Sequence, residues 1–396
     1  MDPNEAVRRL TEMGEPSDER GYVTYIEGLL KEAGVPTALI RGDGPRPCLY
    51  AKIAGSGGHS PLLLYGRVGL EQSEGGPVGL SGGAALFVTT MLKIKAMKIR
   101  LSYDLLLLLV TCDEDGGLRL VTENYPKLFY GVKYAINDTG GFPVMFEDKK
   151  MHPIIVTERQ AARFRVTARG AMALSRIIQA AARLEKKPLP VRLTEPVKRM
   201  ASEFGKALGE TDELLFRFMQ RPFLTRKVAS VMGANKKPLF ESLLANEAKI
   251  IAVKAINEQN ADAPPESAYF DVEARLLPNI SIKEGMADIR GVIGAGYEIE
   301  ALRGFDGRPV DMALYDAMAE TLIERDHTSL PVPFVSRDIT EARYLARLGV
   351  QTYGFAPIDA LGTYSYFEIP KAGGQTSPDA LTSGAQTLLE FLSKRE

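Results

Sequence analysis

The sequence is poor in the side chains that disulfide frameworks and zinc sites use. Its 396 residues include two cysteines and three histidines. Cys48 and Cys112 lie far apart and no CxxC occurs, which argues against both a disulfide framework and a thiolate zinc site. No apolar run reaches the roughly 18 residues that a membrane span needs. The net charge of −1 gives no signal for a nucleic-acid or membrane partner.

The first residues, MDPNEAVRRL, resemble a capped helix start and lack the apolar core of a signal peptide. Apolar residues make up 45% of the chain and charged residues 25%, values that are typical of a globular protein. The length favours two domains. We therefore expect a cytoplasmic protein of the size of an enzyme.

One stretch organises the chain, the sequence YDLLLLLVTCDEDGG at residues 103–117. A short apolar run bounded by turn signals predicts a strand that is buried on both faces. Asp113, Glu114 and Asp115 would follow its carboxyl end, where open α/β sheets place their ligand sites. Adjacent carboxylates repel one another, so a site there needs cations, a metal or protonation to compensate them. The alternative interpretation is a solvated acidic turn.

The order of the remaining segments predicts an α/β domain that a second domain interrupts. Strands that end in polar or glycine-rich loops, with helices between them, are typical of a doubly wound, mostly parallel sheet. This pattern covers residues 1–157 and resumes over residues 306–396. Between them, residues 158–305 segregate helices from strands, which predicts an inserted α+β domain. Within it, residues 159–199 contain 11 Lys and Arg against two Asp and Glu, which we interpret as a solvated basic face in preference to an anion-binding patch.

Six segments, in order along the chain, are similar to motifs of one enzyme family. They are PLLLYGRVGL, VGLSGGAALFV, VTCDEDGG, YAINDTGG, VEARLLPNIS and SRDITEARYLARLGVQTYGFAPI. Together they resemble the di-zinc amidohydrolases that include aminoacylases, acetylornithine deacetylases, succinyl-diaminopimelate desuccinylases and carboxypeptidase S. The resemblance implies a zinc-exopeptidase-like α/β domain with an inserted lid or dimerisation domain. It also implies action on the amide bond of N-acyl amino acids or small peptides.

Most positions of the family's zinc ligands hold other residues in this chain. By the resemblance, the first ligand histidine corresponds to Arg67 and the aspartate two residues later to Gly69. The bridging aspartate corresponds to Gly79, and the final histidine to Gln375. Arginine stays protonated in proteins and cannot bind zinc, and glycine offers no side chain. Zinc is therefore implied by the family resemblance only, and we expect no cofactor.

Three acidic positions of the family site are retained. The resemblance places Glu114 at the general-base position, and Asp115 and Asp138 at metal-ligand positions. An arginine in place of a metal ligand puts a fixed positive charge beside such carboxylates. We therefore interpret Arg67 as a surrogate for the metal. The alternative is that Arg67 points to solvent and that the pocket has decayed.

Two further features concern the substrate and the lid. Glu341 stands where the family has aspartate, and Arg343 keeps the arginine that holds a substrate carboxylate in relatives. Arg343, Asp138 and Gln375 are the predicted substrate contacts. The family's GxxxHxSxP lid segment is missing from ARGAMALSRII, and with it an oxyanion donor that contributes roughly 3–4 kcal/mol in comparable enzymes. His152 and His327 flank turns, and we expect them at the surface.

Three hypotheses for function remain open. The first is an amidohydrolase or carboxypeptidase of the family. The second is a metal-free enzyme with a repurposed cleft, with Glu114 as acid or base and Arg67 and Arg343 as anion clamps, catalysing acyl transfer or amide condensation. The third is a binding or scaffold protein without catalysis. The first two take a small-molecule substrate. The resemblance also implies a homodimer formed through the lid.

Overall fold

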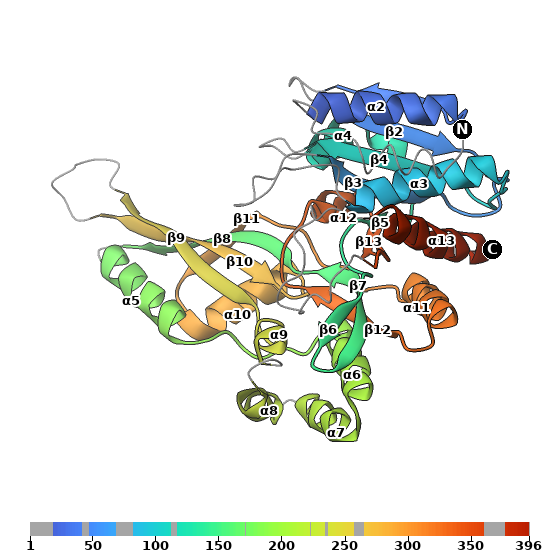
Figure 1. Cartoon of the computed structure of the whole chain (residues 1–396). Helices are drawn as coiled ribbons and strands as arrows, with labels where there is room; N and C mark the ends of the chain where they lie inside the picture. The colour runs from blue at the N-terminus through green and yellow to red at the C-terminus, as the bar shows by residue number, and fades with distance from the viewer. Residues whose placement is uncertain are drawn as a thin grey trace. The chain divides into compact units, whose positions relative to one another are not determined.

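The chain forms two compact units. The computed structural model describes residues 19–41, 47–68, 82–111, 117–170, 172–221, 223–233, 237–256, 265–359 and 377–395. The first unit consists of Met1–Val156, Asp311–Phe334 and Glu341–Glu396, and the second of Thr157–Val310 and Val335–Thr340 (Figure 1). A lid or dimerisation role for the second unit stays a prediction.

A mixed sheet with a parallel centre forms the first unit. Its strands follow the order β1-β2-β4-β3-β5-β13-β7-β12, and β6 pairs with β7. The pairs β4–β3, β3–β5 and β5–β13 are parallel, whereas β1–β2, β2–β4 and β13–β7 are antiparallel. This arrangement confirms the predicted α/β fold. The strands are β1 (Thr37–Ile40), β2 (Cys48–Ile53), β3 (Leu62–Val68), β4 (Leu105–Thr111), β5 (Tyr134–Asn137), β6 (Val144–Phe146), β7 (Lys149–Glu158), β12 (Leu330–Ser336) and β13 (Gln351–Gly354).

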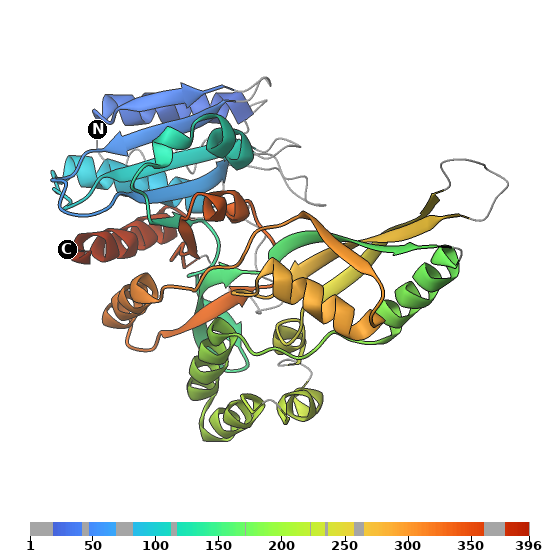
Figure 2. The ribbon, with the colours of Figure 1, turned by 180° about the vertical axis from the view of Figure 1, so that it is seen from behind.

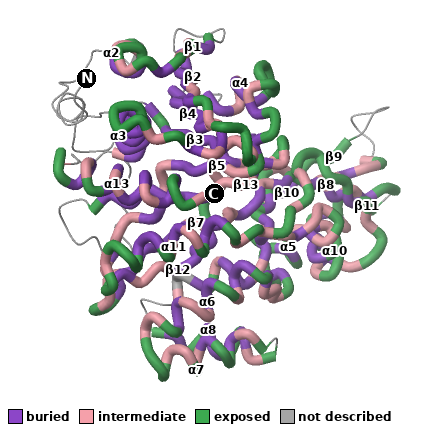
Figure 3. Tube along the Cα trace, turned by 90° about the vertical axis from the view of Figure 1, so that its right-hand side faces the viewer, coloured by how far each residue is buried: buried purple, intermediate pink, exposed green. Residues whose placement is uncertain are grey.

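Helices cover both faces of this sheet. On one face α4 and α12 pack on the core that includes Leu63, Leu106 and Leu108, and on the other face α3 packs on β3 beside α2 and α13 (Figures 1 and 2). All seven residues of β4 are buried, which confirms the strand predicted from the apolar run (Figure 3). The helices are α2 (Glu19–Glu32), α3 (Gly82–Ala96), α4 (Gly117–Asn124), η1 (Pro126–Phe129), α11 (Ala313–Arg325), α12 (Ala342–Arg347) and α13 (Pro378–Lys394). Among the described residues, no helix is long and apolar enough to cross a membrane.

The second unit is an antiparallel sheet with helices on one face. Its four strands are β8 (Gln160–Arg169), β9 (Glu247–Ile256), β10 (Ser267–Leu276) and β11 (Glu298–Arg303), in the order β11-β8-β10-β9. Alternate residues of β8 and β10 point into a core closed by α5 (Ala173–Lys186) and α10 (Ile282–Ile293). Four more helices follow α5, namely α6 (Glu195–Leu208), α7 (Glu210–Met219), α8 (Thr225–Val231) and α9 (Lys237–Glu241).

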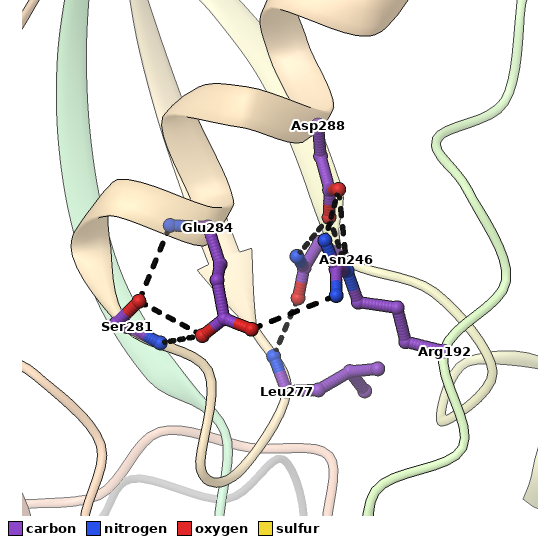
Figure 4. A network of polar contacts seen from close by, with 6 residues as sticks. All are labelled: Arg192, Asn246, Leu277, Ser281, Glu284 and Asp288. Atoms are coloured by element: carbon purple, nitrogen blue, oxygen red, sulfur yellow. Dashed lines mark hydrogen bonds and ion pairs between the residues drawn. The ribbon is translucent and has the colours of Figure 1, made fainter.

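A buried carboxylate joins three segments of the second unit. Asp288, on α10, is 4% exposed and accepts hydrogen bonds from Arg192 Nε at 2.9 Å and Arg192 Nη2 at 2.7 Å (Figure 4). Asn246 Nδ2 donates to the same carboxylate at 2.8 Å, and Asn246 Oδ1 accepts from the backbone N–H of Leu277 at 2.7 Å. Bidentate pairing by arginine is the geometry that compensates a buried carboxylate best.

The basic stretch predicted from the sequence is largely paired with acidic neighbours. The pairs join arginines of the stretch to carboxylates on adjacent strands and helices: Arg159–Glu247, Arg163–Asp271, Arg165–Asp271, Arg169–Glu298 and Arg192–Asp288. Most of these acidic residues lie after residue 240 in the sequence. A count over residues 159–199 therefore overstates the local positive charge.

Candidate functional site

The candidate site lies at the carboxyl end of the parallel strands β3 and β5. Arg67 is the exposed, next-to-last residue of β3, and Asp138 follows β5 directly. The strands pair so that Tyr65 lies opposite Asn137. The backbone N–H of Arg67 donates to Asp138 Oδ2 at 3.2 Å. Two residues that are 71 positions apart in sequence are thus neighbours, as expected for a site at this edge of a doubly wound sheet.

The loop that carries Asp138 is fixed by side-chain hydrogen bonds. Asn137 Nδ2 donates to the hydroxyl of Tyr65 at 3.1 Å, and the Thr139 hydroxyl donates to Asn137 Oδ1 at 2.6 Å. Gly141 N–H donates to the carbonyl of Pro153 at 2.8 Å. These bonds leave the backbone on both sides of Asp138 little freedom, so its carboxylate is held in place before any ligand binds.

His152 supports the same loop from inside the sheet. It is a buried residue of β7, with Nδ1 3.1 Å from the carbonyl of Gly141 and Nε2 3.3 Å from the hydroxyl of Ser329. Its surface position, predicted from the adjacent turn signals, was wrong, because the strand continues through KKMHPII. Burial lowers the pKa of His152, although its bond to Gly141 opposes this effect. His152 therefore holds the loop as a neutral imidazole.

The first turn of α3 approaches Asp138 so closely that glycine is required there. A Cβ on Gly83 would lie 2.9 Å from the Cα of Asp138 and closer still to its Cβ. A Cβ on Gly66 would lie 3.1 Å from the Cα of Ala84. At Gly83, the last glycine of the sequence SEGGPVGLSGG, this tight packing explains why a larger residue is not tolerated. The amino terminus of a helix also favours a nearby negative charge.

Two more charged side chains join Arg67 and Asp138 from the segment that enters α12. Burial raises the pKa of Glu341, the charges of Arg67 and Arg343 lower it, and the charge of Asp138 raises it. The net direction is upward, so the loss of hydration outweighs the attraction of the two guanidinium groups. We call Arg67, Asp138, Glu341 and Arg343 the charge cluster. The sequence motifs identified these positions but gave no sign that Glu341 is half-buried.

Arg343 is held by an aromatic neighbour. Its guanidinium lies 4.7 Å from the ring centroid of Tyr344, and its Nη2 donates to the Tyr344 hydroxyl at 3.0 Å. Arg347 contacts the same ring at 5.3 Å but faces solvent. Stacking of this kind restricts a long side chain and so fixes where its guanidinium lies.

The zinc-ligand positions that the structure describes, Arg67 and Asp138, offer one carboxylate and no imidazole. The position implied for the first ligand is an arginine, which stays protonated, and Asp138 accepts a backbone N–H. Within the described ranges, no group of three or more His, Cys, Asp or Glu side chains could hold a metal ion. The one histidine close to the Asp138 loop, His152, contacts Gly141 and Ser329 with its two ring nitrogens. The charges present are those of an arginine–carboxylate site.

Several predicted residues lie outside the described residues, namely Glu114, Asp115, Gly69, Gly79 and Gln375. The segment with Glu114 and Asp115 connects β4 to α4, and its two flanks are close together. A Cβ on Gly117 would lie 2.7 Å from the carbonyl oxygen of Thr111. Asp379, four residues after Gln375, is exposed in the first turn of α13. The roles predicted for Glu114, Asp115 and Gln375 stay predictions.

Comparison with solved structures identifies the fold. The chain is similar over 99% of its length to an M20 metallo-carboxypeptidase, Sso-CP2, from Sulfolobus solfataricus, with 99% of that chain covered, a TM-score of 0.56 and 15% identity. It is also similar to the aminopeptidase PepT from Bacillus cereus, with 99% and 97% of the two chains covered, a TM-score of 0.54 and 12% identity. A dinuclear metal-binding M20 peptidase from Bacillus subtilis is similar as well, with 99% of this chain and 98% of that chain covered, a TM-score of 0.53 and 12% identity.

These likenesses show that the chain has the fold of the M20 metallopeptidases, and they confirm the resemblance drawn from the sequence motifs at the level of fold. No protein-family model matches the sequence, and no curated protein sequence matches it. Fold alone does not carry over the activity of these relatives.

The raised pKa of Glu341 predicts how Glu341→Gln changes stability with pH. A raised pKa means that the folded state favours the protonated acid, so this stabilisation is present at low pH and is lost as the pH rises through the folded-state pKa. Glutamine mimics the protonated form at every pH. We expect the melting temperature of the variant, relative to the wild type, to be higher at pH 8 than at pH 4. If the melting temperature of Glu341→Gln fell relative to that of the wild type as the pH rises, the raised pKa of Glu341 would be contradicted.

Proposed function

We propose that this chain is an amidohydrolase-type protein that binds N-acyl amino acids or small peptides and acts on their amide bond without a pair of zinc ions. The charge cluster carries the proposal. On an M20-type fold, the position implied for a zinc ligand holds Arg67, whose charge acts on the half-buried carboxyl of Glu341 beside Asp138. A guanidinium supplies a permanent positive charge where relatives would use a metal.

Each residue has a distinct role in this proposal. Arg343 binds the carboxylate of the substrate, because a guanidinium pairs with a carboxylate through two parallel hydrogen bonds. Arg67 stabilises the negative charge that develops on the amide oxygen. Glu114 accepts the proton of the attacking water, and it donates this proton to the leaving nitrogen when the C–N bond breaks. Asp138 and Gln375 contact the substrate. Asp115, which follows Glu114 in the sequence, adds a second negative charge.

A non-catalytic binding protein is the second candidate, and one observation favours it. The strand β8 ends at Arg169 and the helix α5 begins at Ala173, so the segment that carries a histidine in the family is missing between them. Without that oxyanion donor, the barrier to amide hydrolysis would be higher by roughly 3–4 kcal/mol. Binding through Arg343 would survive this loss. A homodimer and a cytoplasmic location, both implied earlier, also stay predictions.

Arg343→Ala tests the substrate contact. We expect it to weaken binding of the tightest ligand in a panel of N-acetyl amino acids and dipeptides by about 10- to 100-fold, because a hydrogen bond to a charged group contributes roughly 1.5–3 kcal/mol. Isothermal titration calorimetry measures the dissociation constants. Arg347→Ala is the matched control, since Arg347 contacts the same Tyr344 ring from the solvent side. Equal affinities for the wild type and Arg343→Ala would refute the assigned contact.

A further inference from the structure

The helices α7 and α8 of the second unit expose apolar and basic side chains together. The apolar members are Leu214 (51% exposed), Phe218 (39%), Phe223 (75%) and Val231 (73%). The basic members are Arg217, Arg221, Arg226 and Lys227, all exposed. We call these eight residues the α7–α8 surface. Soluble proteins scatter single apolar residues over their surfaces, whereas four within 18 residues form a local concentration.

The exposed apolar side chains are not needed to hold these helices in place. The inner faces of α6, α7 and α9 meet through Phe204, Phe216 and Phe240, whose rings lie 4.8–6.0 Å apart. Val228 on α8 is buried as well. These buried residues form the core between the helices, whereas Phe223 is 75% exposed and Phe218, 39% exposed, contacts Arg221. The exposed parts of both side chains are therefore accessible from solvent.

From the second half of α7 through α8, all charged side chains are basic. Residues 214–240 contain six Lys and Arg and no Asp or Glu. The acidic residues nearest in sequence are Glu210, Asp212 and Glu213, in the first turn of α7, and Glu241, at the end of α9. Glu213 pairs with Arg217 at 2.9 Å, and Arg226 donates to the carbonyl of Leu189 at 3.0 Å. The whole-chain charge of −1 conceals this local excess of positive charge.

We propose that the α7–α8 surface binds the surface of an anionic lipid bilayer. Helices with exposed Phe and Leu side chains and a cluster of Lys and Arg bind such interfaces, where the apolar groups enter the boundary of the acyl chains and the basic groups pair with the headgroups. Phe223 stands between α7 and α8 and is three-quarters exposed, so it can enter the lipid without any rearrangement of the helices. The expectation of no membrane partner rested on the whole-chain charge. The proposal is independent of the reaction at the charge cluster.

Sedimentation of the full chain with vesicles tests this proposal. The probes are vesicles of phosphatidylcholine alone and vesicles with about 30% phosphatidylserine, at low salt. We expect at least about tenfold stronger binding to the anionic vesicles, because each basic side chain at such a surface favours binding by roughly fivefold. Equal binding to both kinds of vesicle, or binding to neither, would overturn the proposal.

Variants assign the binding to this surface. Phe218→Ser with Phe223→Ser, and separately Arg221→Gln with Lys227→Gln, should each reduce binding to anionic vesicles by about tenfold or more. Met172→Ser with Ile178→Ser is the control, since these apolar residues are equally exposed (65% and 55%) elsewhere in the second unit. Unchanged binding by both surface variants, with melting curves like the wild type, would refute the assignment. If the chain were retained on immobilised polyglutamate but did not bind vesicles, the proposal would be wrong, and the surface would bind an acidic protein instead of lipid.

Discussion

Gly83→Ala is expected to lower the free energy of unfolding by about 3 kcal/mol and to weaken ligand binding at the charge cluster. The new Cβ would lie 2.9 Å from the Cα of Asp138 and even nearer to its Cβ, closer than real Cβ atoms approach one another. Overpacking of this kind typically costs about 1–3 kcal/mol, and the backbone next to Asp138 is pinned by hydrogen bonds and cannot yield freely. Urea unfolding measures the first effect, and calorimetric titration of the folded variant measures the second.

Gly28→Ala provides the matched control for this change. Gly28 lies within α2, and a Cβ there would meet no atom within 4 Å. Alanine is favoured over glycine inside a helix by about 1 kcal/mol, so the control should be as stable as the wild type or more stable. If Gly83→Ala behaved like Gly28→Ala, the close approach of α3 to Asp138 would be disproved.

Arg192→Leu is expected to destabilise the second unit by about 3 kcal/mol. The substitution removes the three hydrogen bonds that Arg192 makes with Asp288 and leaves a carboxylate, 4% exposed, that still accepts a bond from Asn246 (Figure 4). Breaking a buried pair at one partner costs about 3–5 kcal/mol, and the partial exposure of Arg192 favours the lower value. Denaturant unfolding followed by circular dichroism checks this value.

Two further variants separate the buried charge from a general loss of packing. Arg199→Leu removes a surface pair with Glu203 on α6 and should change stability by no more than about 1 kcal/mol. Arg192→Leu combined with Asp288→Leu removes both charges and should recover part of the lost stability. A double variant less stable than the single variant would show that the unpaired carboxylate is not the cause.

The elements that the sequence predicted best are those whose burial pattern is local. β4 was recognisable because its six consecutive apolar residues, Leu105 to Val110, can be buried together only between two layers of helices. The order of motifs gave the fold, and comparison with solved structures confirms it. Pairing of charges across the second unit was not predictable, because Arg165 and Asp271 are 106 positions apart and meet only through the register of β8 and β10.

The sequence motifs predicted which residues lie in the candidate site, but they predicted less well how far each side chain is buried. Arg67 and Asp138 follow from motif positions, and the parallel register of β3 and β5 brings them together. The partial burial of Glu341 depends on how α12 packs, which no local pattern encodes. The error at His152 has a similar origin, since turn residues beside it concealed a strand that continues into the interior. Burial of polar groups is set by the tertiary structure.

The amount of metal bound to the purified chain shows whether the charge cluster replaces a zinc site. The proposed function requires that arginine at position 67 has replaced a metal ligand and that the charge cluster functions without zinc. We expect the full chain, expressed with added zinc or cobalt and analysed by mass spectrometry of the elements after gel filtration, to contain less than about 0.1 equivalent of metal per chain, because arginine cannot act as a ligand. A content near two equivalents per chain would contradict the claim.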